Sequence, residues 1–157
     1  MSPKLIRAYL DEAHVDYMVR GHQPAFSSSR VAQATHVPGR ELAKVVIVWL
    51  DSRMAMAVLP STQHVDLEHL RELTGAENVR LAHEEEFASR FQHCEVGAMP
   101  PFGNLYHMEV FVAESLTEDE FISFNACTHT DIMTMAYADF ERLVRPAVLA
   151  FAEPTQV

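Results

Sequence analysis

The sequence is poor in cysteine, and it has no long apolar run. Its 157 residues include only two cysteines, Cys94 and Cys127. Two cysteines are too few for a disulfide scaffold, so we expect buried or pocket-lining thiols rather than a bridge, in a reducing compartment. No stretch reaches the roughly 20 apolar residues of a membrane helix, and residues 1–14 are typical of an amphipathic helix rather than a signal peptide. We therefore expect a cytoplasmic protein with no membrane partner.

Basic residues are also scarce. The chain has 12 lysines and arginines against 22 acidic residues, a formal net charge of -10. Affinity for nucleic acid comes largely from neutralising phosphates, so this balance argues against DNA binding and against a long RNA footprint. Several basic residues nevertheless fall in the first third of the chain, which leaves room for a small phosphate-binding patch: Arg20, Arg30, Arg40, Lys44 and Arg53.

Length and composition indicate one globular domain. The chain has the size of an ordinary domain and is 48% hydrophobic and 22% charged, which is typical of a folded core rather than of disorder. It shows no internal repeat, linker or low-complexity segment. We therefore expect a single domain over residues 1–157.

Hydrophobic periodicity predicts short helices and strands in mixed order. Helices are expected at 3–14, 27–37, 66–73, 84–91 and 137–143, and strands at 15–20, 45–50, 54–59, 78–82, 106–112, 120–125 and 131–135. The runs at 45–50 and 54–59 predict a β-hairpin buried on both faces, and residues 153–157 are expected to fray. Without a regular βαβ alternation, the pattern favours an α+β fold with a mixed, barrel-like β-sheet surrounded by helices.

The segment CEVGAMPPFG, residues 94–103, is a constrained loop. Gly97 lets the main chain approach a ligand closely, whereas Pro100 and Pro101 fix φ and remove two N–H groups. Such a loop can present backbone N–H groups to a carbonyl oxygen, as an oxyanion hole does. An ordinary tight connection is the alternative, because turns are where glycine and proline usually serve.

Lys44 stands just before the apolar run VVIVWL. At the edge of a strand its ammonium group can point into a cleft and bind a phosphate or the negative charge that develops on an ester. A solvated lysine flanking a strand is the alternative, because most lysines are exposed.

Metal and nucleophile chemistry receive little support from the spacing of histidine and cysteine. His93 and Cys94, together with Cys127 and His129, offer suitable donors, but no HExxH, CxxC or HxH motif occurs, so we expect no metal. A Cys–His nucleophile needs a third group that orients the histidine, and the sequence has no local signature for one. The run 84–86 of three glutamates is explained by the dipole of a helix start.

Four segments together are more specific than any one of them: HQPAFSS at 22–28, PGRELAKVVIV at 38–48, CEVGAMPPFG at 94–103 and FNACTHTDIMTMAYADFERLVRP at 124–146. In order and spacing they resemble the YbaK/EbsC family of aminoacyl-tRNA editing domains, which includes the editing insertion of bacterial prolyl-tRNA synthetase and freestanding deacylases. The recurrent lysine and G-x-x-x-P loop of that family look like Lys44, Gly97 and Pro101.

The resemblance implies hydrolysis of the ester between an amino acid and the 3′-terminal adenosine of tRNA, with no metal or other cofactor. By similarity Lys44 and Gly97 are the catalytic candidates, and water attacks the ester. The remaining residues of the substrate pocket are expected to be His22, Phe26, Ala98, Met99, Pro101, Ala126, Cys127, Thr128 and His129. Family members commonly have glycine at the position of Cys127, so the volume of this pocket and its preference for an amino acid are expected to differ.

Two functions follow as hypotheses. The first is a freestanding trans-editing deacylase that binds the acceptor end of an aminoacyl-tRNA, with tRNA-Pro the foremost candidate and an aminoacyl-tRNA synthetase as a possible delivery partner. The second is a non-catalytic module that binds an aminoacyl-nucleotide or a protein partner. A metal hydrolase is a third reading and requires stoichiometric zinc. The sequence does not identify the amino acid, because one methylene is worth only about 1 to 3 kcal/mol of discrimination.

Overall fold

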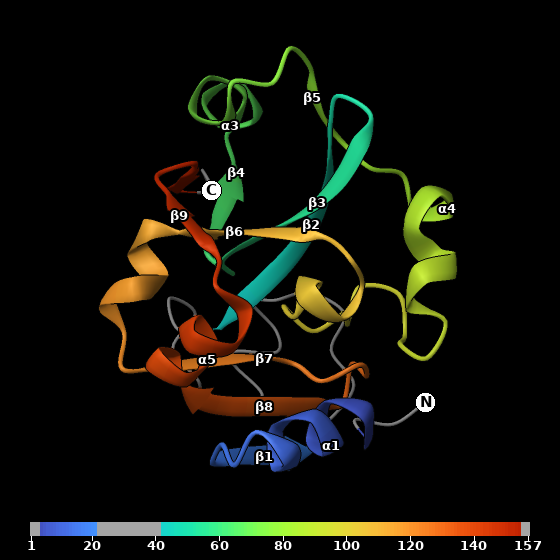
Figure 1. Ribbon diagram of the computed structural model, residues 1–157, viewed down its shortest axis with the longest axis vertical. Coiled ribbons are helices and arrows are strands. Elements are labelled where there is room, and N and C mark those ends of the chain that lie inside the picture. The colour runs from blue at the N-terminus through green and yellow to red at the C-terminus, as the bar shows by residue number, and fades with distance from the viewer. Residues whose placement is uncertain (1–3, 22–41, 155–157) are drawn as a thin grey trace.

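The computed structural model describes residues 4–21 and 42–154 (Figure 1). The α-helices are α1 (Lys4–Glu12), α3 (Leu67–Thr74), α4 (Glu84–Phe87) and α5 (Tyr137–Val144), and the 3-10 helices are η1 (Ala88–Phe91), η2 (Gly103–Leu105) and η3 (Glu114–Glu118). The strands are β1 (Tyr17–Gly21), β2 (Ala43–Leu50), β3 (Arg53–Pro60), β4 (Gln63–Val65), β5 (Val79–Leu81), β6 (Glu109–Ala113), β7 (Phe121–Asn125), β8 (Asp131–Ala136), β9 (Ala147–Leu149) and β10 (Ala152–Pro154). The predicted helix at 27–37 lies outside the described residues.

The predicted hairpin is confirmed as β2 and β3, which pair antiparallel along their whole length. Asp51 takes the left-handed conformation, with φ +56°, at the turn between them. Its carboxylate accepts hydrogen bonds from the backbone N–H groups of Glu77 and Asn78, so the turn is also tied to the start of β5. Alternate residues of β3 enter two different core clusters, which explains why this strand reads as an unbroken apolar run.

The described strands form three sheets rather than one barrel. A mixed sheet has the order β5-β2-β3-β6-β9, in which β6 is parallel to both β3 and β9. An antiparallel sheet has the order β1-β8-β7, and β4 pairs with β10. The predicted α+β class and mixed sheet are therefore confirmed, while these strands close no barrel.

Two hydrophobic clusters hold the sheets and helices together. The larger one lies between the mixed sheet and the three-stranded sheet, and α1 and α5 contribute Ile6 and Phe140 to it. The smaller cluster covers the other face of the mixed sheet, where α3 buries Leu70 and the chain after β9 buries Phe151. In Figure 1, α3 and the three-stranded sheet accordingly lie at opposite ends of the molecule.

Local chemistry sets the ends of several elements. Asp66 caps α3 by accepting a hydrogen bond from the His69 N–H, and Gly75 ends this helix at φ +75°. The helix predicted at 84–91 is confirmed only in part, because α4 gives way to the 3-10 turn η1 at Ala88. The strand predicted from 106 begins at Glu109, because the N–H groups of Tyr106 and Met108 both donate to Gly103 O in a preceding turn.

The end of the chain corrects one expectation. Residues from Glu153 were predicted to fray, but Glu153 and Pro154 belong to β10 and pair with β4. The Glu153 carboxylate also lies 2.8 Å from His64 Nε2 across this pair. No helix in the described parts of the chain is long and apolar enough to cross a membrane.

Candidate functional site

The loop around Gly97 and the segment after β7 form one continuous wall. Residues 94–98 and 126–129, which we call the Gly97 wall, are joined by backbone hydrogen bonds. The Glu95 N–H donates to Cys127 O at 2.8 Å, and the Cys127 N–H donates to Ala98 O at 2.9 Å. Two segments that the sequence singled out separately are thus adjacent in space.

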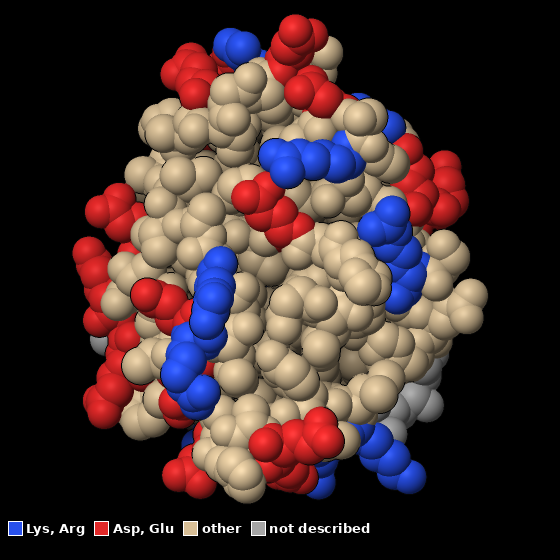
Figure 2. Space-filling model, viewed as in Figure 1, with Lys and Arg blue, Asp and Glu red and all other residues tan. Residues whose placement is uncertain are grey.

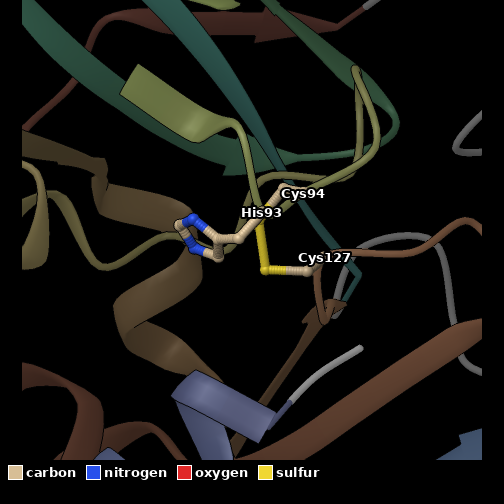
Figure 3. Close-up of side chains that lie close together, drawn as sticks. All are labelled: His93, Cys94 and Cys127. Carbon is tan, nitrogen blue, oxygen red and sulfur yellow. A yellow bond between two sulfur atoms is a disulfide. The ribbon is translucent and has the colours of Figure 1, made fainter. Parts of the chain in front are cut away.

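A disulfide between Cys94 and Cys127 spans the same wall (Figure 3). This finding corrects the expectation of two unbridged thiols, because that expectation relied on the small number of cysteines and on the expected compartment rather than on distance. The fold brings their Cα atoms to 4.3 Å even though they are separated by 33 positions in the sequence. The donor atoms of His93, Cys94 and Cys127 also lie within 4.8 Å of one another. The fold thus brings together three potential metal ligands whose spacing in the sequence did not predict a metal site. Both sulfurs are engaged in the bridge.

Gly97 occupies a position that favours glycine. Its φ is +87°, in the left-handed region, and a Cβ there would lie 3.2 Å from Cε1 of His129. The His129 ring is held over the loop, since its Nε2 lies 2.7 Å from Val96 O. Its backbone N–H donates to the Glu95 carboxylate at 3.0 Å. His129 therefore packs directly against the exposed tip of the loop.

The tip of this loop carries unused backbone donors. Within the described structure, the N–H groups of Glu95 and Ala98 donate to carbonyl oxygens, whereas those of Val96 and Gly97 make no hydrogen bond. Val96 and Gly97 are exposed, and the chain becomes buried again from Ala98 onward. Two successive donors are consequently available to a ligand at the position where the sequence predicted an oxyanion hole.

Most of the other predicted pocket residues support the wall from inside. Ala98, Met99, Pro101, Ala126 and Cys127 are all buried. Thr128 is buried as well, and its hydroxyl donates to the Asp131 carboxylate at 2.5 Å. His22 and Phe26 lie outside the described residues. Of the predicted site residues that the structure describes, Lys44, Gly97 and His129 are the ones that retain exposed surface.

Cys127 has an unusual backbone conformation for a residue with a side chain. Its φ is +71°, in the left-handed region that disfavours a Cβ by about 1 to 2 kcal/mol. A glycine at this position adopts the same turn without that cost. The conformation gives a physical reason for the glycine that the resemblance leads one to expect there, and in this chain a cysteine adopts it.

Lys44 is half-buried in β2, directly opposite Leu59 of β3. Burial lowers the pKa of its ammonium group, and no charge of opposite sign contributes to this shift. Among the described residues no carboxylate forms an ion pair with it. A partly desolvated cation without an anionic partner is a favourable place for an anionic ligand to bind.

The start of β2 connects Lys44 to the Gly97 wall. Leu42 and Ser123 form a parallel bridge between β2 and β7. Two residues further along both strands are Lys44 and Asn125, which therefore project on the same face. From Val48 onward the same edge of β2 pairs with β5, so β2 and β7 part where Lys44 and Asn125 lie. Asn125 is followed directly by the Gly97 wall.

Asn125 is a candidate that the sequence analysis did not select. Its side-chain oxygen is buried and accepts no hydrogen bond within the described structure. Buried polar atoms are nearly always paired, so an unpaired acceptor on the same face as Lys44 calls for an explanation such as ligand binding. A polar residue closing the buried strand β7 was the one sequence signal that could have pointed to it.

Residues 22–143 match the family described as the aminoacyl-tRNA editing domain. The chain belongs to this family. The match includes Lys44, Asn125 and both segments of the Gly97 wall, and the resemblance proposed from the sequence motifs is confirmed. Binding of an aminoacyl-tRNA substrate is what an editing domain implies.

Solved structures share the fold of this editing domain. The crystal structure of a hypothetical protein has a TM-score of 0.85 and 17% identity, and the match covers 94% of this chain and 99% of that one. A structure described as a "putative trans-editing enzyme for prolyl tRNA synthetase" has a TM-score of 0.82 and 17% identity, with coverage of 98% and 99%. A search of curated proteins found no match.

Proposed function

We propose that this editing domain is a deacylase acting in trans, which hydrolyses the ester that links a small mischarged amino acid to the 3′-terminal adenosine of a tRNA. tRNA-Pro is the foremost candidate, because the chain shares its fold with a structure described as a trans-editing enzyme for prolyl-tRNA synthetase. The observation that carries the proposal is Lys44, a half-buried cation without a carboxylate partner among the described residues, two positions after the bridge that joins β2 to β7, the strand that leads into the Gly97 wall.

The geometry supports positioning and charge stabilisation rather than a protein nucleophile. The Thr128 hydroxyl donates to Asp131, and the sulfurs of Cys94 and Cys127 are bonded to each other, so none of these groups is free to attack an ester in this form. We assign the attack to water. The water oxygen adds to the carbonyl carbon, and the ribose oxygen then leaves with a proton, which gives a free amino acid and an uncharged tRNA.

Lys44 and the tip of the Gly97 wall would stabilise two different negative or polar groups of the substrate. The ammonium group of Lys44 binds the terminal phosphate or the polar end of the substrate. The N–H groups of Val96 and Gly97 receive the oxyanion that forms on the former carbonyl oxygen. Removing one such donor in other enzymes costs about 100- to 1000-fold in rate, which sets the scale expected here.

The surface charge favours a small tRNA footprint. Figure 2 shows basic side chains scattered among acidic ones on the face in view. Four of the described arginines are paired with carboxylates: Arg53 with Glu109, Arg71 with Glu68, Arg80 with Glu86 and Arg142 with Asp139. Contact through the acceptor end, with or without delivery by a synthetase, is therefore the binding mode proposed. The affinity for tRNA should then depend only weakly on salt. A plot of the logarithm of the binding constant against the logarithm of the salt concentration should have the small negative slope expected when only a few phosphates are neutralised.

Deacylation of a panel of aminoacyl-tRNAs by wild type, Lys44→Met and Lys4→Met tests the proposal. The sequence has only these two lysines, and Lys4 is an exposed residue of α1, so it is a matched control. We expect Lys44→Met to lose at least tenfold in kcat/KM and Lys4→Met to match wild type. Wild-type rates no faster than hydrolysis in buffer for every tRNA would refute the enzymatic function. Tight binding of a non-hydrolysable aminoacyl-adenosine without turnover would instead identify a binding module.

The pH dependence of the reaction provides a second readout. Because the pKa of Lys44 is lowered from 10.5, its charge is lost at a lower pH than that of an exposed lysine. We expect the rate above the buffer background to fall as pH rises through this lowered pKa. Lys44→Arg should shift that falling limb to higher pH, because guanidinium stays protonated. An identical pH profile for wild type and Lys44→Arg would show that the ionisation of Lys44 does not control the rate of deacylation.

A further inference from the structure

The disulfide joins the two segments of the Gly97 wall close to Gly97 and to His129. Cys94 begins the loop that leads to Gly97, and Cys127 lies just before His129, whose ring contacts Gly97. Apart from this bond, the wall is held by the hydrogen bonds of Glu95 and Cys127 and by those of His129. The redox state of the two sulfurs therefore decides whether the wall is held by a covalent bond or by hydrogen bonds alone.

Breaking the bond should also relax the turn at Cys127. This residue holds a left-handed φ of +71°, which its side chain disfavours, and the bridge to Cys94 helps to fix it there. In the dithiol form the hydrogen bonds must sustain that conformation unaided. We therefore expect the donors at the tip of the wall to be less well ordered after reduction.

Cys94 is the less buried of the two bridged cysteines, and it lies near a surface cavity. Cys127 is fully buried, whereas Cys94 keeps 5% of its surface exposed. The Tyr106 hydroxyl lies 3.9 Å from Cys94 Sγ and 2.6 Å from His93 Nε2. Both His93 and Tyr106 line a surface cavity of about 320 Å³ beside α1. The cavity therefore reaches two side chains that lie next to the bridge, His93 in sequence and Tyr106 in space.

We propose that Cys94 and Cys127 form a reversible redox site that sets the activity of the editing site, an inference that rests on the proposed function. A small thiolate attacks Cys94 Sγ and breaks the bond to Cys127, whose sulfur leaves as a thiolate and takes up a proton. A second thiol then attacks the mixed disulfide and releases Cys94 as a thiol together with a small-molecule disulfide. Two electrons pass from the small thiols to the protein, and a small-molecule disulfide reverses the reaction.

Redox buffers of reduced and oxidised dithiothreitol test this site on the full chain. Alkylation followed by mass measurement counts the free thiols, and hydrogen exchange reports on residues 94–98 and 126–129 without any need for activity. On reduction we expect two alkylated cysteines, faster exchange in both segments and at least a fivefold fall in deacylation kcat/KM. Reoxidation should restore all three properties. Thiols that remain alkylatable in the oxidising buffer would overturn the proposal.

Two variants separate the redox site from a merely structural bridge. Cys127→Gly keeps the left-handed turn but cannot form the bond, and Cys94→Ser removes the bond from the other side. We expect the activity of both variants to be indifferent to the redox buffer. A wild-type enzyme equally active in both buffers would refute the inference but leave the deacylase function standing, whereas inactivity in both buffers with normal redox-dependent exchange would refute the deacylase function alone. One equivalent of Zn²⁺ held by the reduced protein and lost in His93→Ala would show a metal site instead.

Discussion

Gly97→Ala tests the proposed site because its effects on backbone strain and on activity can be separated. At φ +87° an alanine costs about 1 to 2 kcal/mol of stability, since a Cβ crowds the following carbonyl in the left-handed region. The new Cβ would also lie 3.2 Å from Cε1 and 3.7 Å from Nε2 of His129, so the imidazole ring must move by a few tenths of an ångström. That ring is held by Val96 O, and any shift therefore reaches the peptide that carries the exposed N–H groups.

Gly75→Ala is the matched control for this prediction. Gly75 has a φ of +75° at the end of α3, and a Cβ there would meet nothing within 4 Å. Both variants should lower the free energy of unfolding in urea by about 1 to 2 kcal/mol. Gly97→Ala alone should lower deacylation kcat/KM, by tenfold or more. Full activity in Gly97→Ala, at the stability predicted for both variants, would refute a role for the Gly97 loop in catalysis.

Three further predictions concern the stability of the fold. Reduction of the disulfide should lower the free energy of unfolding by about 3 to 4 kcal/mol, because the bond closes a loop across 33 positions; an unchanged urea midpoint in reductant would contradict this. Hydrogen bonding to Arg80 lowers the pKa of Glu86 from 4.5 to about 2, so its stabilising effect is complete above pH 4.5 and lost as pH falls towards 2. Glu86→Gln should flatten the pH dependence of the melting temperature within that window, and a curve parallel to wild type would argue against the pair. Gly103→Ala should destabilise the domain by about 1 to 3 kcal/mol, because its Cβ would lie 2.5 Å from Val110 Cγ2 and 2.8 Å from Met108 O; a wild-type melting temperature would show that the turn can relax.

The sequence predicted most of the described strands and α-helices, at least in part, but it missed β4, β9 and β10. The hairpin of β2 and β3 was evident because both strands lie inside the mixed sheet and are apolar on both faces. In contrast, β4, β9 and β10 contain three residues each, which leaves little periodicity to detect, although the equally short β5 was predicted within 78–82. They exist because the fold brings edge segments together, as the pairing of Glu153 with His64 shows.

The residues of the candidate site were also predicted only in part from the sequence. Gly97 and Lys44 could be selected from the sequence because a glycine before two prolines and a lysine at a strand edge are local signals. The position of His129 against Gly97 depends on a contact between segments distant in sequence, and the significance of Asn125 depends on a buried oxygen without a donor. A polar residue at the end of a buried strand was the only local hint of Asn125, and the contact between His129 and Gly97 and the unpaired oxygen are visible only in the three-dimensional arrangement.

Cys127 shows how the local and the long-range information combine. The resemblance drawn from the sequence implies a glycine at this position, and a left-handed turn at φ +71° is a physical reason to expect one. A cysteine without a partner would be destabilised by the left-handed conformation, and no bond from its sulfur would offset that destabilisation. With Cys94 at a Cα distance of 4.3 Å, the same side chain forms a bond that holds the turn and the Gly97 loop together. At this position a covalent bond to Cys94 therefore adds to the backbone hydrogen bonds that hold the wall together.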